Sequence, residues 1–187
     1  MSRLGWCLAA FAIILPVMEV SGKEPSTSSL QEKRECIEQM KERTAALVAE
    51  DWSQLDTIAR RFIRSCSDVL DWRYIADAYG AVASANNEMG HFEEALIQAN
   101  AGTAEHYFGT SSHIEKLKAL FALNRVEEAK KSFRVAERLI HSVIEQNDTD
   151  LQKAQTESDR ELYLSSNALY QSQLKILDSY RPLLGNK

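Results

Sequence analysis

Apolar residues recur along this chain at the three- and four-residue spacing of amphipathic helices, with charged residues between them. From Leu30 onwards this spacing predicts a helix that ends near Ala49, on the positions Ile37, Met40, Leu47 and Val48. A second helix is predicted after the polar break at residues 50–53, on Leu55, Ile58, Ala59, Phe62 and Ile63. With only 7 glycines and 3 prolines, the chain has few residues that interrupt helices, so we expect an all-α fold.

The N-terminal segment has the pattern of a secretory signal peptide. Arg3 precedes an apolar run from Leu4 to Met18, and the small residues of Val20-Ser21-Gly22 follow it. We expect residues 1–22 to be cleaved after Gly22, and residues 23–29 to form a flexible leader. An uncleaved membrane anchor is the alternative, but about 15 apolar residues fall short of the roughly 20 that span a bilayer. The expected location is therefore exported: periplasmic if the source is a bacterium, or secreted.

Two cysteines follow the signal segment, and the first hairpin brings them together. If the first two helices pack antiparallel around a turn near residue 51, Cys36 lies opposite Cys66. An exported chain reaches a compartment that permits disulfides. We therefore predict a Cys36–Cys66 bridge that stabilises the fold by about 2–4 kcal/mol. Two free, buried thiols are the alternative.

A motif in the middle of the chain occurs twice, 34 residues apart: Gly90-His91-Phe92-Glu93-Glu94-Ala95 and Asn124-Arg125-Val126-Glu127-Glu128-Ala129. A period of this length in a helical pattern is typical of stacked helical hairpins. The alanines at 95 and 129 would let paired helices approach closely. Asn124 can stand in place of the turn glycine because asparagine tolerates the left-handed backbone region.

Both copies resemble the tetratricopeptide repeat, at Tyr79, Val82, Ala83, Gly90, Phe92, Ala95 and Ala99 and at Leu117, Leu120, Asn124, Val126, Ala129, Phe133 and Ala136. The resemblance implies about three stacked antiparallel hairpins over residues 30–145 and a protein-binding role. It also implies that the first helix of each hairpin lines a concave groove. The partner-binding residues would then be Asp77, Ser84, Asn87, Glu88, Ile114, Lys118 and Phe121. Ile114 and Phe121 would anchor a peptide or helix, unless the last helix of the chain buries them.

The boundaries after the first copy follow from capping and turn residues. Residues 107–110 break the helix, and Ser112 and Glu115 have the spacing of a capping box that starts the next helix. The turn-rich residues 147–150 are expected to end the helix after that. A last helix within residues 146–187 carries an apolar residue every seven positions, at Leu162, Leu169, Ile176 and Leu183. We expect it to cap a monomeric array. A dimerising coiled coil is the alternative, which the polar Ser166 and Gln173 disfavour.

Charge and motifs exclude several functions. The net charge of −5 and the lack of a basic cluster argue against a nucleic-acid ligand. The 4 histidines show no metal-ligand spacing, and no phosphate loop or nucleophile motif occurs, so we expect neither a cofactor nor an enzyme. The prediction is a non-catalytic adaptor or scaffold that binds a protein or peptide and contacts no membrane after signal cleavage. The alternatives are a periplasmic immunity-type protein that neutralises a toxin, and an accessory subunit of an envelope enzyme or complex.

Overall fold

The computed structural model describes residues 27–107 and 109–185, and over these residues the chain is all-α, with no β-strand. The helices are α1 Thr27–Val48, α2 Trp52–Cys66, α3 Trp72–Glu88, α4 Phe92–Glu105, α5 Thr110–Ala122, α6 Val126–Lys153, α7 Glu157–Tyr180 and the short 3₁₀ helix η1 Arg181–Leu184. The expected signal peptide, its cleavage at Gly22 and leader residues 23–26 lie outside the described residues. Residues 27–29, assigned to the leader from the sequence, belong to α1.

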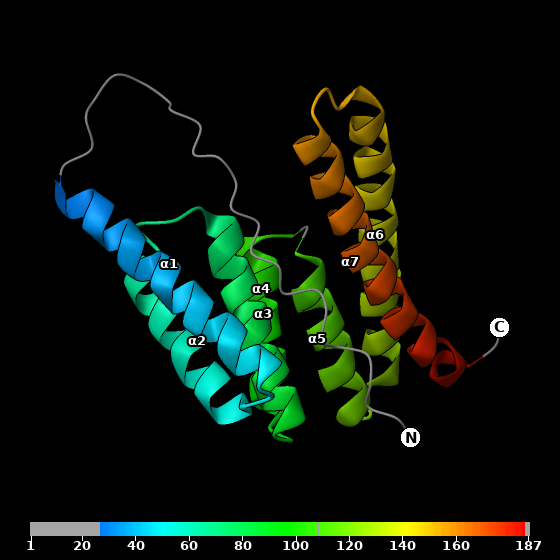
Figure 1. Ribbon diagram of the computed structural model, residues 1–187. Coiled ribbons are helices and arrows are strands. Elements are labelled where there is room, and N and C mark those ends of the chain that lie inside the picture. The colour runs from blue at the N-terminus through cyan, green and yellow to red at the C-terminus, as the bar shows by residue number, and fades with distance from the viewer. Residues whose placement is uncertain (1–26, 108, 186–187) are drawn as a thin grey trace.

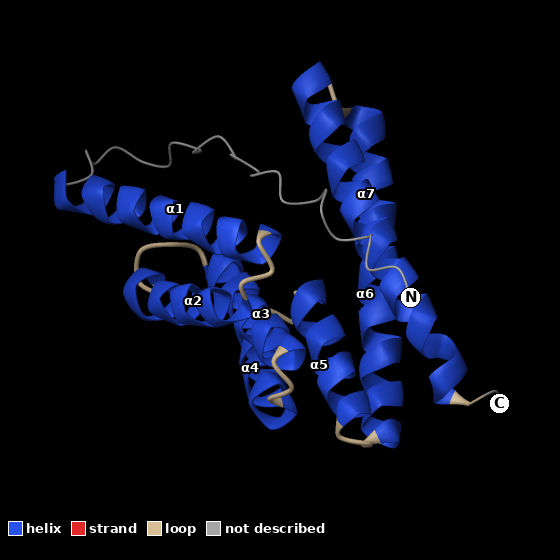
Figure 2. Cartoon of the chain, turned by 60° about the horizontal axis from the view of Figure 1, so that its bottom comes forward, coloured by secondary structure: helices blue, strands red, loops and turns tan. Residues whose placement is uncertain are grey.

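Each helix packs against the next one in the chain, and further contacts join α3 to α5 and α5 to α7. The result is a row of helices that runs from α1 to α7 (Figures 1 and 2). The last two helices are much longer than α5, with 28 and 24 residues against 13. They extend together beyond the first residue of α5 (Figure 1).

The first two helices form the predicted hairpin. Its turn contains Glu50 with a φ of 53°, in the left-handed region, and Asp51 then caps α2 by accepting a hydrogen bond from the amide of Gln54 (3.0 Å). The predicted apolar positions Leu55, Ile58, Ala59 and Phe62 are buried. At the open end of the hairpin, a disulfide joins Cys36 to Cys66, with their Cα atoms 5.9 Å apart. The predicted bridge is confirmed.

The repeated motif produces the same local structure twice. Gly90 has a φ of 80° and Asn124 a φ of 57°, so asparagine adopts the left-handed turn as expected. Ala95 and Ala129 have no exposed surface, which agrees with a close helix approach at both positions. In each copy the paired glutamates occupy the first turn of the following helix, where the helix dipole favours negative charge.

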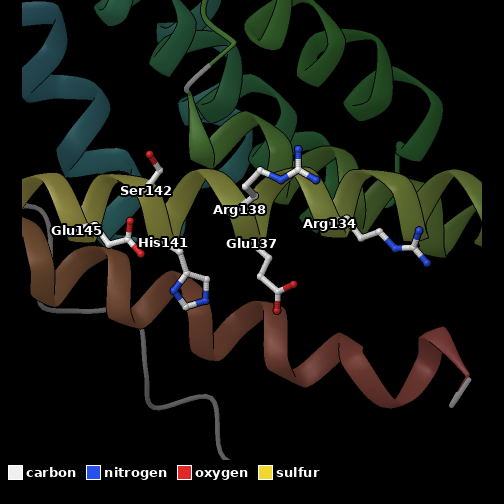
Figure 3. Close-up of a pocket in the computed structure, with 6 residues that line it drawn as sticks. All are labelled: Arg134, Glu137, Arg138, His141, Ser142 and Glu145. Carbon is white, nitrogen blue, oxygen red and sulfur yellow. The ribbon is translucent and has the colours of Figure 1, made fainter.

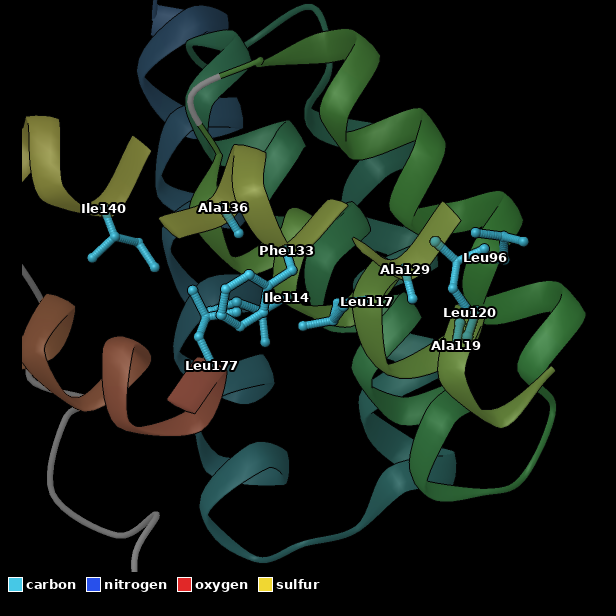
Figure 4. Close-up of a cluster of buried hydrophobic side chains, with 11 residues drawn as sticks. Leu96, Ile114, Leu117, Ala119, Leu120, Ala129, Phe133, Ala136, Ile140 and Leu177 are labelled. Atoms are coloured by element: carbon cyan, nitrogen blue, oxygen red, sulfur yellow. The ribbon is translucent and has the colours of Figure 1, made fainter. Parts of the chain in front are cut away.

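The largest core cluster lies where α5 meets α6 and α7 (Figure 4). Ile114 and Leu117 of α5 are buried together with Phe133 and Ile140 of α6 and Leu177 of α7. Helices α5, α6 and α7 therefore share one core, to which α4 adds Ala95 and Leu96, and α7 is attached to the array mainly through its C-terminal half. Arg181 adds a polar contact there by donating to Glu137 of α6 (2.6 Å).

The start of α5 differs from the prediction. The helix begins at Thr110, its N-cap residue Gly109 makes no side-chain cap bond, and the expected capping box at Ser112 does not form. Ser112 instead donates a hydrogen bond to the Ala76 carbonyl of α3 (3.3 Å). A Cβ atom added at Gly102 of α4 would overlap the Ser112 hydroxyl and lie 3.1 Å from the Ala76 oxygen. The hydroxyl of Ser112 thus contributes to the close packing of α3, α4 and α5, and it does not cap α5.

The predicted end of α6 at residues 147–150 is also wrong, because the helix continues through these residues to Lys153. Asn147 donates hydrogen bonds to the Ser166 hydroxyl and the Asn167 side-chain oxygen of α7, both at 2.9 Å. The hairpin turn comes later, and Thr156 caps α7 by accepting from the Asp159 amide (3.1 Å). Asn147 and Asp148 thus bond to α7, and Thr149 and Asp150 bond to residues of α6 itself, so these polar side chains are satisfied within a continuous helix.

Candidate interaction surface

The predicted partner-binding residues come from two helices that lie side by side, α3 and α5. On α3, Asp77 and Glu88 are exposed, and Ser84 and Asn87 are half-buried. Asp77 accepts a hydrogen bond from Arg43 of α1 (2.6 Å), a residue that is 9% exposed and whose guanidinium carbon lies over the Phe62 ring. The α3 part of the predicted set therefore reaches the surface, with one of its two carboxylates already paired.

The polar residues of the set between α3 and α5 form a buried network. Asn87 donates hydrogen bonds to the backbone oxygen and the carboxylate of Glu115, both at 2.9 Å, and Lys118 donates to the same carboxylate at 2.8 Å. Burial alone would lower the pKa of Lys118, but the attraction of Glu115 outweighs it and the pKa is raised. The ammonium of Lys118 is thus held by its own chain in a structural contact.

The two expected apolar anchors are covered by the last helix. Ile114 is 3% exposed and shares a core with Leu177 of α7. Phe121 is half-buried and stacks on Tyr180, with ring centroids 5.2 Å apart. Of the two sequence-based interpretations, the structure therefore shows burial of Ile114 and Phe121 against α7.

The tyrosines of α7 show how closely this helix approaches the array. Burial raises the pKa of Tyr170, and the Asp77 carboxylate on α3 adds to the effect. Burial also raises the pKa of Tyr180, against an opposing effect of Lys118 and with Glu115 and Glu88 adding to the rise. The C-terminal half of α7 therefore lies over α5, within electrostatic reach of α3.

Ile144 and Tyr170 still pack against the shared core, and beyond them the described contacts of α6 and α7 are with each other. Among the described residues of α6, Ile140 is the last that is buried, and in α7 Leu177 is the only one. The distal hairpin, defined as residues 141–169, still carries Val143, Leu162 and Leu169, which are half-buried, and Leu164, which is 56% exposed. Within residues 27–107 and 109–185, no third helix covers these apolar side chains.

The distal hairpin also carries a net negative charge. It carries six carboxylates and two cations, a difference of −4. The carboxylates are Glu145, Asp148, Asp150, Glu157, Asp159 and Glu161, and the cations are Lys153 and Arg160. The described part of the hairpin has one ion pair, between Arg160 and Glu157 at 3.9 Å. Asp148, Asp150 and Asp159 accept hydrogen bonds from neutral side chains, so among the described contacts most of these carboxylates keep an unneutralised charge that can attract a positive partner.

A shallow depression of about 560 Å³ lies on another side of α6 and is lined by Arg134, Glu137, Arg138, His141, Ser142 and Glu145 (Figure 3). All six residues come from this one helix, so the depression is a row of surface side chains along its axis and not an enclosed site. In the part of the chain that the structure describes, no three His, Cys, Asp or Glu residues gather as metal ligands would.

A cluster of aromatic rings surrounds the connection between α4 and α5. His106 makes an edge contact with Trp72 at 4.1 Å between ring centroids, and a ring nitrogen of His113 lies 2.8 Å from the Tyr107 carbonyl. Burial lowers the pKa of His113, and Lys116 contributes to this, while the contact with Tyr107 opposes it. These histidines hold the connection in place, and sequence spacing alone did not relate them.

Comparison with known proteins does not identify the chain, since no family model, curated protein or solved structure matches it. The tetratricopeptide-like assignment therefore stays a prediction. Over the described residues, none of the helices combines the length and the apolar character that a membrane crossing requires.

Proposed function

We propose that the chain is an exported, non-catalytic protein-interaction module built from tetratricopeptide-like hairpins and capped by the α6–α7 pair. One observation carries the proposal: α6 and α7 continue past α5 with apolar side chains that no other described residue covers. Amphipathic helices gain most of their stability by burying such a face, so an uncovered one indicates a partner.

Two further observations support parts of the proposal. The Cys36–Cys66 disulfide fits an oxidising compartment and hence export. Buried ionisable side chains have structural partners, as Lys118 has with Glu115 and His113 with Tyr107, which fits a role without catalysis.

Site-specific photocrosslinking in the native source tests this function. A photoreactive residue at Leu169, on the distal hairpin, is expected to give a discrete protein adduct. The matched control is Asn100, an exposed residue of α4, which should give none. Equal adducts at both positions, or none at Leu169, would contradict a binding role for the hairpin.

A further inference from the structure

The faces of α6 and α7 that hold α5 can be followed past its end by helical periodicity. On α7, Tyr180 marks the side that faces α5, because it stacks on Phe121. Leu169 and Leu162 precede Tyr180 by 11 and 18 residues, or about three and five turns at 3.6 residues per turn. Both leucines therefore lie on the α5-facing side of α7, and both precede Tyr170, which packs against the core that α5 shares.

On α6, the reference residue for the same count of helical turns is Ala136, which is buried in the core shared with α5. Val143 and Asp150 follow it by 7 and 14 residues, or about two and four turns. Both residues are half-buried, and Asp150 accepts a hydrogen bond only from Gln146 of its own helix among the described contacts. The α5-facing side of α6 thus continues with one apolar and one acidic position.

Together these four residues define what we call the distal face: Val143 and Asp150 of α6, and Leu162 and Leu169 of α7. The same faces of α6 and α7 are covered by α5 closer to the core, where Ile114 is buried in one cluster with Phe133, Ile140 and Leu177 (Figure 4). Figure 1 shows the two helices rising past α5 at this point. The part of the chain that the structure describes supplies no third helix there, in a position roughly collinear with α5.

We propose that the distal face binds one amphipathic, positively charged helix of a partner protein, which completes a three-helix bundle with α6 and α7. This names the partner class for the interaction function proposed above and rests on it. The part of α6 beyond Ile140 has 13 residues, about 20 Å at 1.5 Å per residue, so the bound segment has three to four turns. Its apolar stripe covers the leucines, as in other helix-in-groove complexes.

The negative charge of the distal hairpin favours a cationic partner helix over a second copy of the chain. The distal hairpin has an excess of four negative charges, so two copies that share this face would bring like charges together. Lysine and arginine beside the apolar stripe of a partner helix would meet Asp150 and its acidic neighbours. The sequence of the hairpin therefore favours a cationic partner of a different kind.

Calorimetric titration of the oxidised chain with synthetic 14-residue peptides tests the proposal. One peptide has leucine at helical spacing and lysine elsewhere, the second replaces lysine with glutamate, and the third is a scrambled leucine–lysine peptide without an apolar face. We expect saturable one-to-one binding of the first peptide, and affinities lower by at least about tenfold for the other two. Equal affinity for the glutamate or scrambled peptide would overturn the proposed partner chemistry.

Matched variants locate the binding site. Leu169→Asp and Asp150→Lys each change the distal face and should weaken binding of the lysine peptide by at least about tenfold. Leu164 lies 16 residues before Tyr180, on the opposite side of α7, and the exposed Glu145 lies nine residues after Ala136, or about two and a half turns, on the opposite side of α6. Leu164→Asp and Glu145→Lys should therefore change the affinity less than about threefold.

Two readouts keep these outcomes distinct. Far-UV circular dichroism must show equal helix content in Leu169→Asp and Leu164→Asp. If it does not, the variant Asp150→Lys, which changes a polar position of the distal face, decides alone. Analytical ultracentrifugation that shows a dimer broken by Leu169→Asp would overturn the proposal in favour of a second copy. If Leu169 crosslinks to a protein but the lysine peptide does not bind, the partner class is wrong while the interaction function stands. If the peptide binds but no native adduct forms, the interaction function fails.

Discussion

Removal of the Cys36–Cys66 disulfide is the perturbation whose size can be worked out most directly. The bridge closes a loop of 30 residues, and the chain-entropy model assigns such a loop about 3–4 kcal/mol at 25 °C. Both sulfurs are buried, so a Cys36→Ala/Cys66→Ala variant also loses some packing. Reduced wild-type protein keeps both sulfur atoms and therefore isolates the loop contribution.

Urea denaturation at 25 °C, followed by far-UV circular dichroism, measures the effect. With an m-value of about 2 kcal/mol/M, the midpoint of the reduced protein should fall by about 1.5–2 M. Hydrogen exchange adds a local readout. Among the described residues of α1, only Cys36, Arg43 and Ala46 are buried, so the first half of the helix is attached mainly through the disulfide. Its amides should lose protection before those of α2.

A midpoint shift below about 0.5 M, with the first half of α1 still protected, would refute this reasoning. That result would mean that the reduced, unfolded chain keeps enough structure to hold the two cysteines close, so that the bridge removes little entropy. A large shift in the alanine variant with no shift on reduction would assign the stabilisation to packing of the sulfurs and not to loop closure.

Three further predictions concern the core, the helix crossing and pH. Leu177→Ala should cost about 2–5 kcal/mol because Leu177 is 1% exposed, whereas Leu183→Ala, at a residue 60% exposed, should change the urea midpoint little. Gly102→Ala should destabilise by about 1–3 kcal/mol, since the added methyl group meets the Ala76 carbonyl at 3.1 Å, and an unchanged melting temperature would contradict this close approach. Burial lowers the pKa of His113 from 6.5, so the imidazole binds a proton more readily in the unfolded state than in the folded state. Neutral His113 therefore stabilises the folded state fully above about pH 6.5, and this stabilisation is lost as the pH falls toward the folded pKa. Urea midpoints at about pH 7.5 and about pH 5.5 should differ less in His113→Gln than in the wild type, and equal differences would rule out His113 as a source of the pH dependence.

The local structure of the repeats could be read from the sequence because it depends on neighbours in the chain. A left-handed turn needs a residue such as Gly90 or Asn124 wherever the hairpin lies, and both adopt it. The cysteine pair was predictable for a similar reason, since antiparallel packing around one short turn relates residues 36 and 66 by symmetry. Helical spacing was sufficient to assign the apolar stripes of α2 and α7 to helices.

The sequence alone did not predict where polar residues find their partners. Ser112 has the spacing of a capping residue but bonds across to α3, and Asn147 belongs to a turn-rich cluster but bonds across to α7. In both cases the partner comes from a distant part of the chain: the backbone carbonyl of Ala76 for Ser112, and side chains of α7 for Asn147. Gly102 gave no sequence signal of the close helix crossing, because its neighbours come from α3 and α5.

Whether another helix covers the predicted partner-binding residues likewise depended on the tertiary structure. The sequence by itself determined that Ile114, Phe121, Leu162 and Leu169 are apolar positions of helices, because side-chain chemistry and periodicity are properties of the chain. Only the tertiary structure decided that α7 covers Ile114 and Phe121 and continues past α5 with Leu162 and Leu169. Burial depends on helix length and packing partners, and the length of α6 is set by polar contacts with α7 that no local pattern encodes.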